Sequence, residues 1–274
     1  MTDVPRLPFN DGRSIPQIGF GVYQIPAEDT ERLVLDAIEV GYRHIDTAWG
    51  YFNEEGVGAA VRNCGLPRDE IFVTTKVWRQ GTEQATESFQ HSLDAMGIDE
   101  LDLLLIHWPA PANDLYVETW ESFIAFRDTG RVRSIGVSNF EPEHIDRLIA
   151  ETGVVPVIDQ VELHPFFQQR ELRGYLGAMG IVTEAWGPIA RGRVADDPLL
   201  VTLANSYGRT PAQIALRWEI QHGIVTIPKS VTPERIASNF DVLDFTISED
   251  DMAMIDALDR PDGRFGPHPN DMNG

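Results

Sequence analysis

Short apolar runs alternate with longer amphipathic segments along this chain, about every 25 to 35 residues. The apolar runs are nearly continuous, which is typical of parallel strands that are covered on both faces. These runs predict strands at 17–22, 43–47, 71–77, 102–107, 132–137, 157–161, 181–186 and 224–227. The helical patterns that follow them lie at 28–40, 53–64, 83–96, 116–129, 141–150, 168–178, 197–207 and 232–239.

Eight strand-then-helix units predict an α/β fold of the (β/α)8 type, a TIM barrel with an N-terminal β-hairpin and extra helices. The length of 274 residues suits such a barrel, which needs roughly 250. An open, doubly wound parallel sheet is the alternative, because the same strands could lie side by side without closing.

Three segments fall outside the repeat. Residues 7–16 carry an Asn-Asp-Gly turn between short apolar pieces, which predicts a β-hairpin before the first strand. Residues 210–220 predict an extra helix, because a threonine occupies the N-cap position and a proline follows it. Residues 260–274 are rich in Gly and Pro and predict an irregular loop. We expect one domain over 1–274, with 1–16 as its hairpin region.

The chain is strongly acidic, with a formal net charge of −21. Nucleic acids and anionic membrane surfaces are therefore excluded as expected partners, since both would be repelled. No apolar run is long enough to cross a membrane, and the N-terminal residues do not resemble a secretory signal. Cys64 is the only cysteine, which fits a reducing compartment. We expect a cytoplasmic monomer that acts on a small molecule.

Four polar residues lie at or just after the ends of predicted strands: Asp46, Tyr51, Lys76 and His107. The strand ends of a barrel meet at one face, which carries catalysis. A tyrosine can protonate the alkoxide left by hydride transfer to a carbonyl, and a nearby ammonium such as that of Lys76 would lower its pKa from about 10. Asp46 would hold Lys76, and His107 would donate a hydrogen bond to the carbonyl oxygen. Each residue alone has an ordinary structural explanation; together they predict Tyr51 as the general acid of a carbonyl reduction.

Several segments resemble the aldo-keto reductase family, in order along the whole chain. They are 41–48 (GYRHIDTA), 102–109 (DLLLIHWP), 133–140 (RSIGVSNF), 160–165 (QVELHP) and 227–230 (IPKS), the last with Arg235 and Asn239. The resemblance implies an NADPH-dependent oxidoreductase that reduces aldehydes or ketones to alcohols, with the four residues above as its catalytic tetrad. Within the family, the chain is most similar to the bacterial 2,5-diketo-D-gluconate reductase group, so a dicarbonyl or keto-sugar substrate is included.

A Rossmann fingerprint is absent, because the Gly-x-Gly at 19–21 lacks the third glycine and the acidic residue that should follow. Barrels instead bind phosphate at the loops after strands seven and eight. Lys229 and Arg235 flank a predicted helix start at Thr232, which suits the 2′-phosphate of NADPH. By position alone, the two basic residues could equally be surface charges.

The resemblance implies further contacts to NADPH or NADP+. Ser138, Asn139 and Gln160 would hold the nicotinamide carboxamide, and Trp186 would lie against the ring. The predicted cofactor residues are Gly21, Val22, Ser138, Asn139, Gln160, Trp186, Gly187, Pro188, Ile189, Ile227, Lys229, Ser230, Val231, Thr232, Arg235, Ser238 and Asn239. Ser238 and Asn239 would reach the adenine side.

Aromatic residues follow several strands at the catalytic end and predict an apolar wall around the substrate. The predicted substrate residues are Trp49, Trp78, His107 and Trp108, with Phe20 and Tyr23 nearby. Structural packing at the barrel rim is the alternative for each aromatic residue.

Two other functions are compatible with the sequence. A cofactor-binding sensor or regulatory subunit would keep the barrel but show little turnover. A metal hydrolase would use His44, Asp46 and His107, although the ammonium of Lys76 nearby would repel a cation. We therefore expect no metal.

Overall fold

The computed structural model describes residues 4–272 and has an eight-stranded parallel sheet at its centre. The strands are β3 (Phe20–Gly21), β4 (His44–Asp46), β5 (Phe72–Val77), β6 (Leu101–Ile106), β7 (Val132–Ser138), β8 (Ile158–Glu162), β9 (Val182–Trp186) and β10 (Val225–Thr226). They lie side by side in chain order without a reversal. The doubly wound alternative is therefore wrong, because that topology requires a point where the strand order reverses.

The two edges of the curled sheet meet. A parallel bridge joins Ile18 to Thr226, and the amide of Gly19 donates to the oxygen of Thr226 at 2.9 Å. The predicted strand at 17–22 is thus regular only at Phe20–Gly21, since the residues before it pair through this bridge.

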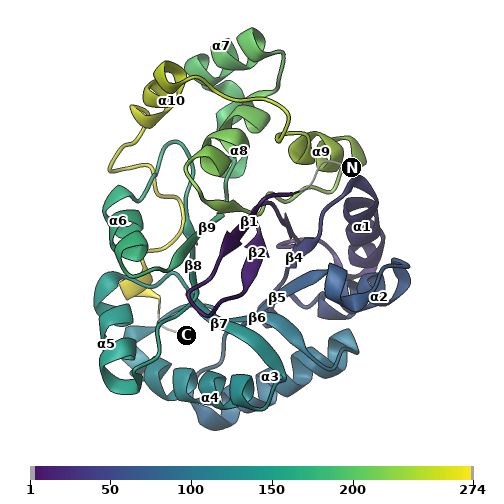
Figure 1. Ribbon diagram of the computed structural model, residues 1–274, viewed down its shortest axis with the longest axis vertical. Coiled ribbons are helices and arrows are strands. Elements are labelled where there is room, and N and C mark those ends of the chain that lie inside the picture. Colours follow the sequence, from purple (N-terminus) through teal and green to yellow (C-terminus); the bar gives the residue numbers. More distant parts are fainter. Residues whose placement is uncertain (1–3, 273–274) are drawn as a thin grey trace.

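Helices surround the sheet in Figure 1, and they follow the strands as predicted. They are α1 (Ala27–Val40), α2 (Glu54–Asn63), α3 (Thr82–Met96), α4 (Tyr116–Asp128), α5 (Pro142–Thr152), α6 (Arg170–Ala178), α7 (Pro198–Tyr207), α8 (Pro211–Gln221), α9 (Pro233–Phe240) and α10 (Glu249–Asp256). The extra helix α8 begins where its sequence predicts, because Thr210 accepts a hydrogen bond from the amide of Gln213 at 3.2 Å. Helix α10 was not predicted.

The N-terminal hairpin covers one end of the sheet. Strands β1 (Arg6–Pro8) and β2 (Ser14–Pro16) pair in antiparallel fashion, and Figure 1 shows them across the centre of the molecule. Phe9 and Ile15 of this hairpin join a buried apolar cluster with Leu103, Ile158 and other residues of the strands. The hairpin therefore closes the end at which the strands begin and leaves the end at which they finish for the polar residues.

Parts of the two predicted terminal segments, residues 1–3 of the hairpin region and 273–274 of the C-terminal loop, lie outside the described residues. Within 4–272, no helix has the length and apolar character needed to cross a membrane.

Candidate active site

The four predicted catalytic residues come from neighbouring strands and one short loop. Asp46 is the last residue of β4, Lys76 lies near the end of β5, and His107 directly follows β6. Tyr51 ends the 3-10 helix η1 (Trp49–Tyr51) after β4. Because parallel strands finish at the same rim, these side chains are brought together at the end opposite the hairpin.

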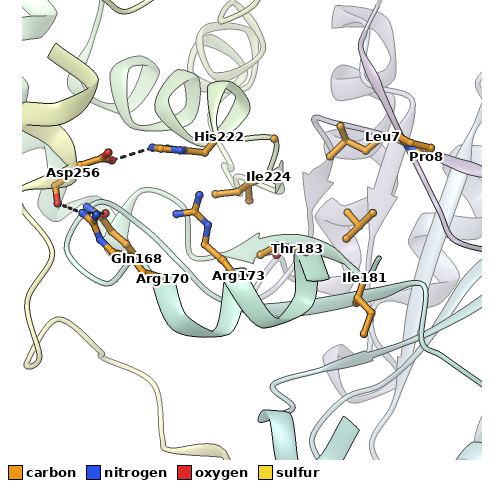
Figure 2. Close-up of a pocket in the computed structure, with 14 residues that line it drawn as sticks. Leu7, Pro8, Gln168, Arg170, Arg173, Ile181, Thr183, His222, Ile224 and Asp256 are labelled. Atoms are coloured by element: carbon orange, nitrogen blue, oxygen red, sulfur yellow. Dashed lines mark hydrogen bonds and ion pairs between the residues drawn. The ribbon is translucent and has the colours of Figure 1, made fainter. Parts of the chain in front are cut away.

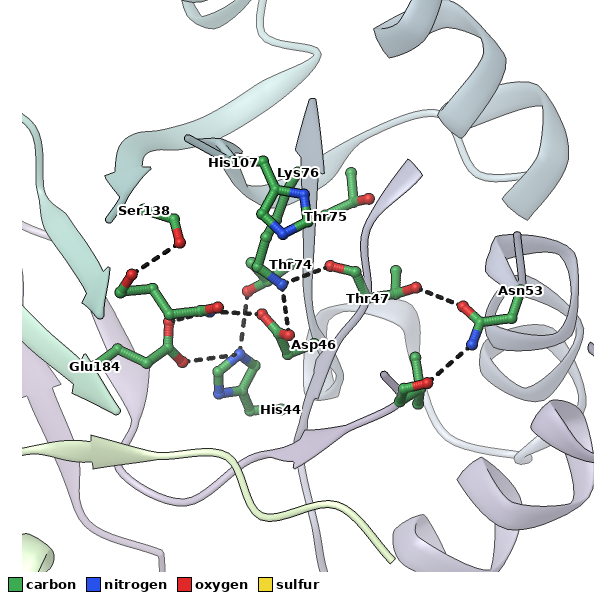
Figure 3. Close-up of polar contacts among 12 residues, drawn as sticks. His44, Asp46, Thr47, Asn53, Thr74, Thr75, Lys76, His107, Ser138 and Glu184 are labelled. Atoms are coloured by element: carbon green, nitrogen blue, oxygen red, sulfur yellow. Dashed lines mark hydrogen bonds and ion pairs between the residues drawn. The ribbon is translucent and has the colours of Figure 1, made fainter. Parts of the chain in front are cut away.

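Lys76 and Asp46 form a buried ion pair at the base of the site (Figure 3). The Nζ atom of Lys76 donates to Oδ1 of Asp46 at 2.6 Å and to the oxygen of Thr47 at 2.8 Å. Lys76 is fully buried. Burial lowers the pKa of Lys76, but the nearby acidic groups, Asp46 above all, outweigh it and leave the pKa raised, so the ammonium stays charged. Burial raises the pKa of Asp46, and Lys76 opposes that rise.

Tyr51 lies between Lys76 and His107. The Nζ atom of Lys76 is 5.1 Å from the centre of the Tyr51 ring, and the rings of Tyr51 and His107 are 5.7 Å apart. The side chain of Tyr51 is partly exposed, but protein atoms surround most of it. This loss of solvent raises the pKa of Tyr51 to about 12. Lys76 acts in the predicted direction and lowers this pKa, but burial has the larger effect. The expectation of a pKa below the usual value of tyrosine is therefore wrong for the protein without cofactor or substrate.

His107 is neutral in this environment. Burial and the ammonium of Lys76 lower its pKa well below the usual range. Its ring packs edge-on against Trp78 at 5.2 Å, and its buried Nδ1 has no hydrogen-bond partner among the described residues. A neutral imidazole carries one N–H donor and can orient a carbonyl oxygen without a charge of its own.

Sequence reasoning missed a second buried carboxyl group, Glu184 in β9. The amide nitrogen of Gln160 donates to Oδ2 of Asp46 at 2.8 Å and to Oε2 of Glu184 at 2.9 Å. Burial, and then the charge of Asp46, raise the pKa of Glu184 to about 8. One signal was available: a glutamate within a strand that is expected to be buried needs a partner.

The structure brings together a different set of metal-ligating side chains from the one that the metal-hydrolase hypothesis named. Donor atoms of His44, Asp46 and Glu184 lie within 4.8 Å of one another, and His107 is not part of this group. Burial and Lys76 lower the pKa of His44 to about 3. Because the ammonium of Lys76 already occupies Oδ1 of Asp46, a cation would meet a like charge there.

The residues predicted for the carboxamide form a connected set. Ser138, the last residue of β7, donates from Oγ to the oxygen of Gln160 at 2.8 Å. Asn139 donates from Nδ2 to the oxygen of His107 at 3.0 Å and accepts from Nε1 of Trp186 at 2.8 Å. Asn139 also has a positive φ of 61°, a conformation that is uncommon for residues other than glycine and is concentrated at functional sites.

The predicted phosphate side combines two loops. Gly187, Pro188 and Ile189 follow β9, and Gly187 has a positive φ of 67°. Ile227, Lys229, Ser230, Val231, Thr232, Arg235, Ser238 and Asn239 follow β10 and continue into α9. Gly21 and Val22 lie at the end of β3, and the amide of Gly21 donates to the oxygen of Pro228 at 3.2 Å.

Thr232 occupies the N-cap position of α9, but its side chain makes no capping hydrogen bond. Its Oγ1 instead accepts from Arg235 at 3.0 Å. The first backbone amides of α9 thus lack the usual side-chain acceptor. Lys229 is partly exposed, and burial lowers its pKa.

The aromatic wall is only partly as predicted. Tyr23 is 54% exposed and packs on Tyr51 with 5.0 Å between the ring centres, so it lines the mouth together with Trp78. Phe20 is fully buried in the core, and its expected place in the wall is wrong. Trp49 has its aromatic contacts with Phe52 and His91. Trp108 is partly exposed, and its oxygen accepts from Gln80 at 2.7 Å.

The C-terminal segment packs over this rim through Glu162, another residue that sequence reasoning did not select. The carboxylate of Glu162 accepts from the amides of Phe265 and Gly266, each at 2.7 Å. The ring of Phe265 stacks on His164 at 5.0 Å and meets Trp186 edge-on at 5.8 Å. Phe265 therefore supports the indole from the side of the C-terminal segment.

Comparisons with known proteins agree with this geometry. The model of the "Aldo/keto reductase family" matches residues 17–260. An aldo-keto reductase of Mycolicibacterium smegmatis is 52% identical over 271 residues, with 98% of each chain covered. The methylglyoxal reductase DkgA of Escherichia coli is 47% identical, again with 98% of each chain covered. The crystal structure of a Gox0644 mutant in complex with NADPH superimposes with a TM-score of 0.94 at 46% identity, covering 98% of both chains. The resemblance noted in the sequence is confirmed: the chain belongs to the aldo-keto reductase family.

Proposed function

We propose that the protein is an NADPH-dependent reductase of aldehydes and ketones, in which Tyr51 protonates the substrate oxygen. The observation that carries this proposal is the buried ion pair of Lys76 and Asp46 directly beneath the Tyr51 ring. A fully buried lysine is costly unless it is paired, and a purely structural role would not require a tyrosine and a histidine over it. Lys76 and Asp46 would act as positioning and electrostatic groups.

Tyr51 would act as the general acid. Its raised pKa keeps the hydroxyl protonated at neutral pH, so the proton is present when a substrate arrives. As negative charge develops on the substrate oxygen, Tyr51 gives up its proton, and the ammonium of Lys76 stabilises the phenolate that remains. His107 would donate its N–H to the same oxygen and fix the orientation of the carbonyl.

The residues on the cofactor side fit a nicotinamide dinucleotide phosphate. Both amide hydrogens of Gln160 are used by carboxyl groups, so its carbonyl oxygen is left to accept from a carboxamide. Trp186 offers a partly exposed indole whose N–H is fixed by Asn139. Lys229, Arg235 and the N-terminal end of α9 would hold the 2′-phosphate. NADPH, when bound, supplies the hydride.

A small dicarbonyl is the substrate class we propose first, because relatives of this chain carry the name methylglyoxal reductase. We further propose that residues 1–274 act as one domain whose curled sheet is a closed (β/α)8 barrel, as the bridge from Ile18 to Thr226 supports. A monomeric state and a cytoplasmic location remain predictions.

The test is NADPH consumption with methylglyoxal and a panel of aldehydes and keto-sugars. Tyr51→Phe should reduce turnover by about 100-fold or more while NADPH binding is unchanged. Tyr175→Phe is the matched control, because this tyrosine donates to Asp146 on the outer surface of the protein. Wild-type turnover in Tyr51→Phe would refute Tyr51 as the acid. Tight NADPH binding by the wild type without turnover on any carbonyl would favour the sensor function instead.

A further inference from the structure

A cavity lies at the opposite end of the sheet from the tetrad. Its volume is about 590 Å³, and its walls include Leu7 and Pro8 of the hairpin and Ile181 and Thr183 at the beginning of β9 (Figure 2). This volume lies within the range of sites for small organic ligands. The proposed reduction uses the other end of the strands and gives this cavity no role.

Arg173 of α6 is the feature of this cavity that lacks an explanation. Among the arginines in residues 4–272, it alone has no hydrogen bond, no ion pair and no aromatic ring beneath its guanidinium. Figure 2 shows its guanidinium directed between His222 and Ile224, with no contact drawn to it. Arg173 is only partly exposed, and this burial lowers the pKa of its guanidinium. A guanidinium has five N–H donors, and here the protein satisfies none of them.

The neighbouring charged groups are already engaged with one another. Arg170 donates to Oδ2 of Asp259 at 3.2 Å and to Gln168 at 2.8 Å. Nε2 of His222 is hydrogen-bonded to Oδ1 of Asp256 at 2.9 Å. Asp256 is the strongest charge that acts on Arg173, but its Oδ1 is already hydrogen-bonded to Trp218 and His222. Glu219 acts more weakly, and burial raises the pKa of Glu219 well above its usual range and favours its neutral form. Arg173 is therefore the one cation of this cavity that remains available.

Two glycines keep the cavity open. Gly174 lines it from the interior of α6, where glycine is among the least favourable residues, and Gly177 lines it from the last turn of this helix. A Cβ atom at either position would meet nothing within 4 Å, so close packing does not require a glycine. Larger side chains at these positions would extend into the space in front of Arg173.

We propose that this cavity is a second ligand site, which binds a small organic carboxylate through the guanidinium of Arg173. A carboxylate matches the fork of an arginine with two parallel hydrogen bonds. Leu7, Pro8, Ile181 and Ile224 form an apolar surface beside it, so the ligand should carry an apolar body rather than a second charge. Asp256 nearby also disfavours a dianion, since a second negative charge would be repelled.

The experiment is a calorimetric titration of the purified protein, without cofactor, with benzoate and with its uncharged analogue benzyl alcohol. Benzoate should bind the wild type at this site, and Arg173→Met should weaken that binding at least tenfold, about the loss of one charge-assisted hydrogen bond. Gly177→Phe should weaken it similarly by filling the cavity, and this variant does not depend on how the protein tolerates the loss of Arg173. Arg32→Met is the matched control, because this exposed arginine lies on α1 and pairs only with surface acids.

Equal benzoate affinity in the wild type, Arg173→Met and Gly177→Phe would overturn the proposal. So would equal affinity of the wild type for benzoate and benzyl alcohol, because recognition would then not involve the charge. Benzoate bound at the tetrad would be unaffected by either variant and is thereby separated from this site. The titration measures no turnover, so failure of the proposed reduction would leave its result unchanged.

Discussion

Replacing Lys76 by methionine tests the ion pair at the base of the site. Lys76→Met keeps most of the buried volume but leaves the carboxylate of Asp46 with only the hydrogen bond from Gln160. Breaking a buried pair in this way typically destabilises a protein by about 3–5 kcal/mol. Protonation of Asp46 limits the charge-dependent part of this loss. This part cannot exceed the free energy needed to protonate the carboxyl group. With an unfolded pKa of about 3.9, that free energy is about 1.5 kcal/mol at pH 5 and about 4 kcal/mol at pH 7.

The sign of the pH dependence follows from this limit. In Lys76→Met, the folded pKa of Asp46 is raised above its unfolded value, so the folded protein binds the extra proton. Stability is then lost as the pH rises from about 4 towards the folded pKa. Lys76→Met should therefore be destabilised more at pH 7 than at pH 5, and turnover should fall as well, because the phenolate of Tyr51 loses its ammonium.

Urea unfolding followed by circular dichroism at pH 5 and pH 7 measures both quantities. The double variant Lys76→Met/Asp46→Asn is the control, since it has no carboxylate to protonate. Its stability difference from the wild type should change much less between the two pH values. An equal loss at pH 5 and pH 7 in Lys76→Met, or the same pH dependence in the double variant, would refute a charge-based role for the pair.

Three further predictions concern other parts of the molecule. The folded pKa of Glu184, about 8, implies that the protein loses stability as the pH rises from about 4.5 to 8. Glu184→Gln should remove this loss, so its free energy of unfolding in urea should depend less on pH than that of the wild type. The same pH dependence in both proteins would contradict the burial of a carboxyl group here. Gly58→Ala should lower the free energy of unfolding, measured in urea, by at least about 2 kcal/mol, because its Cβ would lie 1.9 Å from a backbone oxygen of α3. Gly174→Ala should instead raise the free energy of unfolding, because its Cβ would enter open space. Glu162→Gln should speed hydrogen exchange at the amide of Phe265, which loses a charged acceptor; unchanged exchange would show that other contacts hold this segment.

The strand and helix pattern could be predicted because each element carries a strong local signal. Strands β5 and β6 are buried at every position, and β6 is an apolar run that only Asp102 interrupts. Helix α10 was missed because only Ile255 of its eight residues is buried, so it has almost no apolar face. The available signal was Ser248 followed by three acidic residues, and Ser248 does cap the helix by accepting from the amide of Asp251 at 3.2 Å.

The tetrad could also be placed, because a residue at the end of a parallel strand has a position that topology alone determines. The contacts of Gln160 could not be predicted in the same way. Its side chain reaches Asp46 across 114 positions of sequence and Glu184 across 24, and which partner an amide selects depends on the curvature of the sheet. Phe20 was misplaced for a related reason: a residue in a short edge strand can face either the mouth or the helices, and its sequence neighbours do not decide which.

The pKa of Tyr51 shows how the structure changes the chemical argument. Sequence reasoning treated Lys76 as the dominant influence, since an ammonium lowers the pKa of a nearby phenol. In the structure, burial has the larger effect, and the pKa rises to about 12. In the proposed reaction the two effects would act on different forms of the site: burial would hold the hydroxyl protonated before the reaction, and Lys76 would stabilise the phenolate after the proton has left. A reductase benefits from both, because its acid must be fully loaded at neutral pH and must still release its proton to an alkoxide, which is a much stronger base than a phenolate. In the proposed mechanism, Lys76 and Asp46 would therefore stabilise the product of proton transfer rather than prepare an ionised tyrosine.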